Sequence, residues 1–130
     1  MKFVDTSFWV ALFFPADAHH DDARVLWAEV DSLLSTNHVV GETWTFLRRR
    51  RNHTDARRAV DAINHSPKVS QIHVEAALEQ EAWTWLRRHD EREYSFVDAT
   101  SFAVMRRRRL REALAFDGDF TAAGFLEARP

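Results

Sequence analysis

Apolar residues along this chain follow two spacings, one typical of short buried strands and one typical of amphipathic helices. Strands are predicted at residues 2–5, 69–74 and 112–116, and a short extended piece is predicted at 35–37. Because strands and helices alternate, the pattern predicts a mainly parallel central sheet with helices on both faces. The expected fold class is therefore α/β, a three-layer α/β/α sandwich.

Helices are predicted where apolar residues recur every three or four positions. They are expected from the Thr6–Ser7 pair to near Pro15, across Val25–Leu34, from about Val39 to Arg51, from Thr54 to near Ser66, from about Glu75 to His89, and from near Asp98 to the Arg106–Arg109 run. With 130 residues, the chain has room for a single domain spanning residues 1–130.

The composition excludes several classes of protein. The absence of cysteine excludes a disulfide scaffold, thiolate metal sites and thiol catalysis, and it fits a cytoplasmic protein. No stretch approaches the ~20 apolar residues of a membrane span, so no membrane association is expected. Lys2 and Lys68 are the only lysines, so 16 of the 18 basic residues are arginine, and the net charge of -2 conceals dense arginine runs.

Four acidic residues stand at positions that favour a shared site. Asp5 and Asp117 each follow a predicted strand, and ligands of open α/β sheets bind beyond the carboxyl ends of the strands. Glu42 and Asp98 lie near predicted helix starts, where the helix dipole favours negative charge. Taken singly, each has an ordinary interpretation as a cap, a turn residue or a solvated helix position.

The flanking residues favour the shared site over the ordinary interpretation. Phe3 and Val4 precede Asp5, and Phe96 and Val97 precede Asp98, so both carboxylates are expected in apolar surroundings. Carboxylates that converge in a partly dry pocket repel one another and raise one another's pKa values. A hard divalent cation resolves that conflict, and ligation by oxygen alone indicates Mg²⁺, with Mn²⁺ as a substitute.

Four short motifs resemble the PIN-domain nucleases, and among them the VapC-type toxins of type II toxin–antitoxin pairs. They are Phe3–Ser7, Val40–Thr43, Ser95–Phe102 and Ala115–Phe120, which occur in the family's order across the whole chain. The resemblance implies a PIN-like fold. It also implies roles for the residues that match the motifs: Asp5, Glu42, Asp98 and Asp117 as the catalytic and metal-binding quartet, Thr6 and Ser7 as supports for the metal or its waters, and Asp119 as an outer helper.

The resemblance further implies the activity and the partners. It implies a metal-dependent endoribonuclease that hydrolyses RNA phosphodiester bonds with Mg²⁺. It also implies a VapB-type antitoxin that blocks the acidic site, a homodimer and a larger toxin–antitoxin assembly. The composition adds an argument for the homodimer, because 5 Trp and 10 Phe in 130 residues are more than a small core readily hides.

The two arginine runs are candidates for RNA contacts. Arg48, Arg49, Arg50 and Arg51 end one predicted helix, and Arg106 and Arg107 begin the run that ends another. At ~1.5 Å per residue, each run lies roughly 10–15 Å from the acid near the start of its helix. A rim that binds RNA phosphates is the favoured interpretation. Pairing with the helix dipole is the alternative.

Two further features are assigned no chemistry. His19 and His20 are predicted to lie in a solvated loop, because adjacent residues on one loop rarely converge on a single ion. Trp44 is the tryptophan closest to a candidate acid, although helical aromatics more often pack in the core. Two alternative functions stay open at this point: an aspartyl-type phosphotransferase or phosphatase, and a PIN-like RNA-binding module without turnover.

Overall fold

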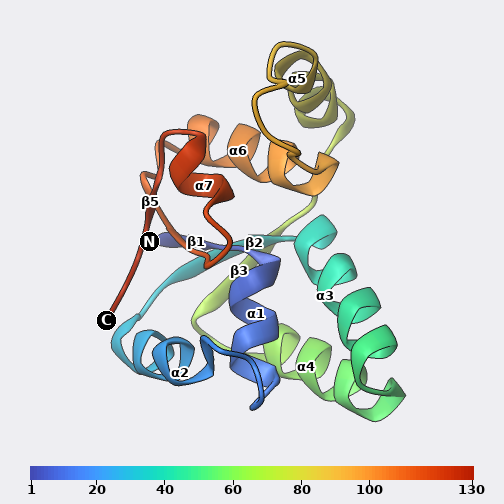
Figure 1. The fold of residues 1–130 in the computed structure, drawn as a ribbon, viewed down its shortest axis with the longest axis vertical. Coiled ribbons are helices and arrows are strands. Elements are labelled where there is room, and N and C mark those ends of the chain that lie inside the picture. Colours follow the sequence, from blue (N-terminus) through green and yellow to red (C-terminus); the bar gives the residue numbers. More distant parts are fainter.

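The computed structural model describes residues 1–130 and contains one five-stranded sheet, in the order β3-β2-β1-β4-β5 (Figure 1). Every neighbouring pair of strands is parallel. The strands are β1 (Lys2–Val4), β2 (Leu33–Thr36), β3 (Val69–Ile72), β4 (Glu112–Leu114) and β5 (Leu126–Glu127).

Seven helices connect the strands and cover the sheet. They are α1 (Thr6–Phe13), α2 (His20–Glu29), α3 (Asn37–Arg50), α4 (His53–His65), α5 (Ala76–Arg87), α6 (Phe96–Arg108) and α7 (Asp119–Ala122). Figure 1 shows α1, α2 and α4 on one side of the sheet and α5 and α6 on the other. The predicted three-layer α/β/α class is confirmed, and α3 contacts both α1 and α6.

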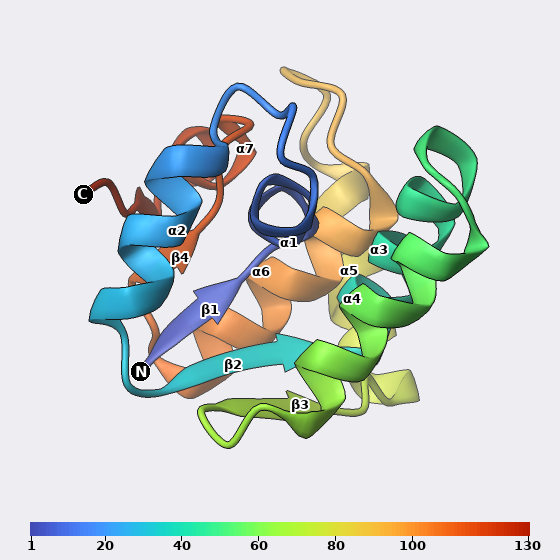
Figure 2. The same ribbon diagram turned by 90° about the horizontal axis from the view of Figure 1, so that it is seen from below.

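The centre of the sheet explains one wrong prediction. The helix expected across Val25–Leu34 ends at Glu29, and Leu33 and Leu34 belong to β2 instead. β2 pairs with both β1 and β3, and all four of its residues are buried (Figure 2). A strand buried on both faces is apolar without alternation, so its leucines extend the helical pattern by coincidence.

Other boundaries differ from the prediction by a few residues, in most cases because a different side chain caps the helix. Asp5, rather than the Thr6–Ser7 pair, accepts the capping hydrogen bond at the start of α1. Asn52 caps α4 in place of Thr54, and α6 begins at Phe96 because Ser95 caps it. The strand expected at 112–116 ends at Leu114, and the pattern predicts neither α7 nor β5.

The aromatic residues pack mainly inside the molecule. Phe102 lies at the centre of one cluster, where its ring contacts those of Phe120, Phe125 and Trp85 at centroid distances of 4.9, 5.5 and 5.1 Å. Among the tryptophans, Trp83 alone is strongly exposed, at 46%. Trp9 and four of the ten phenylalanines are fully buried, whereas the other phenylalanines and the remaining tryptophans except Trp83 are half-buried. The argument for a homodimer from aromatic content stays a prediction. No helix has the length and apolar character needed to span a membrane.

Candidate active site

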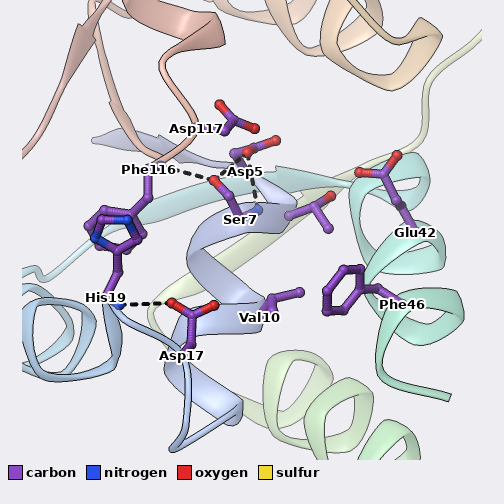
Figure 3. A pocket seen from close by; sticks show the side chains of 10 residues that line it. Asp5, Ser7, Val10, Asp17, His19, Glu42, Phe46, Phe116 and Asp117 are labelled. Atoms are coloured by element: carbon purple, nitrogen blue, oxygen red, sulfur yellow. Dashed lines mark hydrogen bonds between the residues drawn. The ribbon is translucent and has the colours of Figure 1, made fainter. Parts of the chain in front are cut away.

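An acidic pocket of about 430 Å³ opens where β1 and β4 end (Figure 3). Its lining residues come from the start of α1, the loop before α2, the middle of α3 and the segment after β4. They are Asp5, Thr6, Ser7, Val10, Asp17, His19, Glu42, Phe46, Phe116 and Asp117. The pocket lies at the carboxyl edge of the parallel strands, where ligand sites of open α/β sheets are found.

Asp5 is held in place by its neighbours in the fold. Its backbone N–H donates to the Leu114 carbonyl at 3.0 Å, which joins the ends of β1 and β4. The Ser7 hydroxyl donates to Asp5 Oδ2 at 2.6 Å and accepts from the Phe116 backbone N–H at 3.0 Å. Ser7 thus fixes the Asp5 carboxylate relative to the segment that carries Asp117, and Figure 3 shows both contacts.

Asp98 is held by a capping box at the start of α6. The Ser95 hydroxyl accepts from the Asp98 backbone N–H at 2.9 Å, and Asp98 Oδ2 accepts from the Ser95 backbone N–H at 3.0 Å. Asp98 is only 6% exposed. Asp98 therefore takes part in capping α6, as its ordinary interpretation predicts. The same two hydrogen bonds fix its carboxylate beside the other acids.

The loop after β4 is organised by two residues that sequence reasoning missed. The Glu127 carboxylate accepts from the Gly118 N–H at 3.2 Å and the Thr121 N–H at 2.9 Å. Arg92 donates from Nε to Asp119 Oδ1 at 2.5 Å and from Nη2 to the Asp117 carbonyl at 3.0 Å. Gly118 has φ 82°, and a Cβ there would lie 3.2 Å from Arg92 Nη2, so both backbone conformation and space favour glycine.

Three carboxylates form one close group. An oxygen from each of Asp98, Asp117 and Asp119 lies within 4.8 Å of the others. Asp5 interacts electrostatically with both Asp98 and Asp117, and it is 1% exposed. The structure thus brings together three members of the expected quartet, with Asp119 beside them.

Burial and mutual repulsion disfavour the charged form of these acids. Burial raises the pKa of Asp5 well above its usual range, the charge of Asp117 raises it further, and the Ser7 hydrogen bonds oppose the shift. Burial likewise raises the pKa of Asp98 to about 7, with a smaller contribution from Asp119. Partial burial of its carboxyl raises the pKa of Asp117 to about 6.

The donor set fits a hard divalent cation. All the converging side-chain donors are oxygens, and burial together with mutual repulsion raises the pKa values of Asp5 and Asp98, a cost that a bound cation would relieve. The Thr6 hydroxyl adds an independent observation, because Thr6 lines the pocket and its buried Oγ1 has no hydrogen-bond partner. A metal ion or its water would satisfy that oxygen.

Glu42 stands apart from this group. It projects from the second turn of α3 on the opposite side of the pocket from Asp5, as Figure 3 shows, and it is not among the carboxylates within 4.8 Å of one another. The α3 start that carries it follows β2 directly, with Thr36 as the cap at 3.1 Å from the Val39 N–H. The quartet is therefore split between two walls.

His19 lies in the exposed loop that the sequence predicts, whereas His20 does not. The His19 ring lies parallel to the Phe116 ring at a centroid distance of 4.6 Å and lines the acidic pocket. His20 begins α2, and its Nδ1 lies 2.7 Å from the Ala11 carbonyl oxygen. Neither histidine belongs to the close group of carboxylates. Phe46 is a further wall residue that sequence reasoning missed.

The arginine runs and Trp44 occupy different surroundings. Arg49 and Arg50 line a cavity that includes Glu42, whereas Arg48 and Arg51 line neither this cavity nor the acidic pocket. Arg106 and Arg107 line cavities together with residues of α5, away from the acids. The Trp44 ring packs edge-on against His53 at 5.4 Å and lines no part of the acidic pocket.

Comparison with known proteins identifies the class to which this fold and site belong. The PIN domain pattern matches residues 2–126, so the chain belongs to the PIN domain family. The 23S rRNA-specific endonuclease VapC20 of Mycobacterium tuberculosis, from strains CDC 1551 / Oshkosh and ATCC 25618 / H37Rv, is 60% identical over 131 residues, which cover 100% of this chain and 99% of the relative.

Solved structures agree with this assignment. The crystal structure of M. tuberculosis VapC20, described as a Sarcin-Ricin loop cleaving toxin, has a TM-score of 0.95 and 57% identity over 100% of both chains. A toxin–antitoxin complex from Klebsiella pneumoniae shares the fold with a TM-score of 0.59 at 14% identity, over 87% of this chain and 83% of that one. The expectations of a PIN domain, a VapC-type toxin and an endonuclease are confirmed.

Proposed function

We propose that this protein is the toxin of a toxin–antitoxin pair and cleaves 23S rRNA in its Sarcin-Ricin loop with the help of Mg²⁺. The observation that carries the proposal is the acidic cluster at the carboxyl edge of the sheet. Oxygens of Asp98, Asp117 and Asp119 lie within 4.8 Å of one another, and Asp5 interacts electrostatically with Asp98 and Asp117. The substrate follows from the relatives, which are named for 23S rRNA and for that loop and match this chain over its full length.

The ion is held by the acidic wall of the pocket. Asp5, Asp98 and Asp117 would supply carboxylate ligands, Asp119 of the close group would assist, and Thr6 would supply a hydroxyl to the ion or its water. When bound, Mg²⁺ polarises the phosphate, lowers the pKa of a water molecule and shields the charge on the leaving oxygen. Mn²⁺ offers the same preference for oxygen ligands and substitutes for it.

The remaining residues position these groups. Ser7 keeps the Asp5 carboxylate aimed into the pocket, and Glu127 and Arg92 hold the peptide group between Asp117 and Gly118. Glu42 contributes the fourth carboxylate from the facing wall. Since these contacts exist before any substrate binds, little reorganisation is needed when the phosphodiester arrives.

The two alternative functions are weaker. An RNA-binding module without turnover gains nothing from convergent negative charges, which repel the polyanion it must bind. An aspartyl phosphotransferase needs Asp5 as a free nucleophile, whereas Asp5 is 1% exposed and its Oδ2 already accepts from Ser7. Neither alternative explains the buried Thr6 hydroxyl without a partner.

The antitoxin is proposed to be a small VapB-type protein. Its segment at the acidic pocket brings an arginine onto the carboxylates and replaces the charge of the metal with a fixed cation. Competition follows: high Mg²⁺ weakens inhibition, and an Asp5→Asn, Asp98→Asn double variant binds the antitoxin less tightly. Unchanged affinity of that double variant would contradict the charge-replacement proposal.

A homodimer, and from it a larger toxin–antitoxin assembly, remains part of the proposal on the strength of the family alone. Trp83 on α5 is the large aromatic left exposed, and its ring stacks on that of Phe96 at 4.2 Å. Sedimentation at tens of micromolar tests the assembly. A monomer at that concentration would remove the dimer proposal and leave the nuclease proposal untouched.

The central experiment compares RNA with a simple phosphate ester. The purified protein is incubated with ribosomes, with isolated 23S rRNA and with a phosphate ester, each with Mg²⁺ or EDTA. We expect one Mg²⁺-dependent cut in the Sarcin-Ricin loop, mapped by primer extension, and none with Asp5→Asn. Hydrolysis of the ester alone would favour the phosphotransferase, and RNA binding without any cut would favour the binding module.

A further inference from the structure

The wall of the acidic pocket formed by α3 continues into a second cavity. This cavity has a volume of about 400 Å³ and is lined by Glu42, Thr45, Phe46, Arg49 and Arg50. Glu42 and Phe46 also line the acidic pocket, so the two cavities are adjacent and share a wall. Figure 3 shows Glu42 and Phe46 one turn apart on α3, with the Phe46 ring pointing toward Val10 across the pocket.

The residues of this wall fall on one face of the helix. Glu42, Phe46, Arg49 and Arg50 are spaced by four, seven and eight positions, which places them in one stripe along α3. At ~1.5 Å per residue, the arginines lie roughly 10–12 Å along the helix axis from Glu42. The stripe therefore runs from the acids to positive charge within one short stretch of surface.

The four consecutive arginines divide between this face and the rest of the helix. Arg51 already has partners, because its Nε lies 3.0 Å from Asp55 Oδ2 and its guanidinium lies over the Phe14 ring at 5.2 Å. Arg48 lines neither cavity. By contrast, Arg49 and Arg50 form no ion pair, and the Arg50 guanidinium lies 5.3 Å from the centroid of the Phe46 ring.

A polyanion that reaches the acids needs positive charge beside them, since the carboxylate group itself repels it. Free guanidinium groups bind phosphate oxygens through two parallel hydrogen bonds, and an aromatic ring beneath one of them limits its conformations. The run on α6 does not offer this arrangement. Arg107 of that run is paired with Glu81 on α5 at 3.0 Å.

We infer that Phe46, Arg49 and Arg50 form a phosphate subsite, which holds a backbone phosphate flanking the bond to be cut and so sets the direction of the RNA strand across the pocket. This inference rests on the proposed function. Arg49 and Arg50 bind the phosphate, and Phe46 supports the Arg50 guanidinium and forms the surface between the subsite and the acids.

The test uses two double variants that remove the same charge from the same turn of α3. In an inactive Asp5→Asn background with Mg²⁺ present, Arg49→Gln, Arg50→Gln is compared with Arg48→Gln, Arg51→Gln. A labelled RNA hairpin with the Sarcin-Ricin loop sequence is the probe, and anisotropy is measured from low to high salt. We expect the first pair to weaken binding about tenfold or more and to flatten the salt dependence by about one slope unit per lost phosphate contact.

The control pair should bind within about twofold of the background, because Arg51 is already paired with Asp55 and Arg48 lines neither cavity. Equal losses for both pairs would overturn the subsite in favour of a diffuse electrostatic effect, and no loss for either would also overturn it. Melting temperatures of all variants exclude misfolding as the cause. A Phe46→Leu variant should weaken RNA binding less than the Arg49→Gln, Arg50→Gln double variant does. An equal or larger loss would place the main RNA contact on the Phe46 ring and would overturn the roles proposed here.

The same variants separate this inference from the nuclease proposal. In the active protein, the Arg49→Gln, Arg50→Gln double variant should raise the KM for the hairpin. The increase in melting temperature caused by Mn²⁺ should stay unchanged. If the wild-type chain cuts no RNA, the nuclease proposal fails, yet the comparison of binding by the two pairs still decides the subsite.

Discussion

The two walls of the acidic pocket are built on opposite principles. One wall carries Asp5 and Asp117, and Asp98 lies beside them. Burial raises the pKa values of these three carboxyls, which are fixed by hydrogen bonds to Ser7, Ser95 and the loop backbone. The other wall is a single helix face, α3, which presents Glu42, Phe46 and exposed arginines.

The difference separates two tasks that a nuclease must perform at one place. The first wall is fixed by hydrogen bonds and holds carboxylates whose ionised form is disfavoured by burial, which suits a metal ion. The second carries exposed side chains and a gradient from negative to positive charge, which suits a polyanionic strand. Substitutions should therefore act differently on the two walls, with turnover lost on the first and RNA affinity lost on the second.

The largest effect is expected on the first wall. Asp5→Asn or Asp98→Asn should lower RNA cleavage by about a thousandfold or more, because a ligand charge for the metal is lost. In the absence of metal, the same changes should stabilise the folded protein by roughly 1–3 kcal/mol, because burying and crowding the ionised carboxylates costs free energy that a neutral amide avoids. Cleavage assays and thermal melts check the two parts. An active Asp5→Asn protein would contradict the mechanism.

The pH dependence of stability follows from the same wall. In the folded protein, Asp98 has a pKa of about 7 and Asp117 one of about 6, both above the ordinary value of an aspartic acid. The folded state therefore binds more protons than the unfolded state, and the free energy of unfolding of the metal-free protein should fall as pH rises from about 4 to 7. Thermal melts in EDTA across this range measure the slope.

Millimolar Mg²⁺ or Mn²⁺ should reverse this trend, since binding to the folded state alone raises the melting temperature by mass action. The reversal should be largest near pH 7, where more of the ligands are ionised than at lower pH. Asp98→Asn serves as the control and should show both a flatter pH profile and a smaller metal effect. If the protein is folded and its melting temperature does not change with Mg²⁺ or Mn²⁺, the proposal of a metal site is contradicted.

A smaller effect is expected at the edge between the walls. His19→Ala should lower RNA cleavage by no more than a few-fold, because the ring lines the pocket through its stacking on Phe116 and lies outside the close group of carboxylates. His19→Phe keeps an aromatic ring on Phe116 and should restore most of the loss. Failure of that rescue together with a large loss would indicate that the imidazole itself takes part in the reaction.

The smallest effect is expected outside both walls, on α6. Arg106→Gln, Arg107→Gln should leave RNA affinity and cleavage within about twofold, because these arginines pack against α5 and Arg107 is paired with Glu81. Binding to the inactive background measures this directly. A loss as large as that of the Arg49, Arg50 pair would show that the substrate extends over α6 as well.

The sequence predicts the parts of the fold that depend on local pattern. The alternation of strands and helices is sufficient for the parallel sheet, and the acids after β1 and β4 indicate where the pocket lies. The split of Leu33 and Leu34 from α2 is not predictable in this way, because a doubly buried strand and a helix face present the same run of apolar residues.

The wall residues show a second limit. Glu127 and Arg92 act through hydrogen bonds to the loop between Asp117 and Asp119, which are 25 to 27 residues from Arg92. No local signal marks such contacts. The stripe of Phe46, Arg49 and Arg50 can be found from its helical spacing to Glu42, but only if the four arginines are considered one by one rather than as a single run. The approach of His19 to Phe116 depends on tertiary packing alone.

The hydrogen bond from the Phe116 backbone to the Ser7 hydroxyl spans 109 positions of the chain and has a consequence for the timing of activity during translation. Asp5 is synthesised before Asp117 and before the Glu127 that holds the Asp117 loop. Before β4 and β5 have been made, the nascent chain lacks Asp117 and Asp119, and Ser7 lacks the Phe116 N–H that fixes it beside Asp5. We therefore expect RNA cleavage to begin only after β4 and β5 have been made and have folded onto β1, so an inhibitor of the acidic site has until that step to become available.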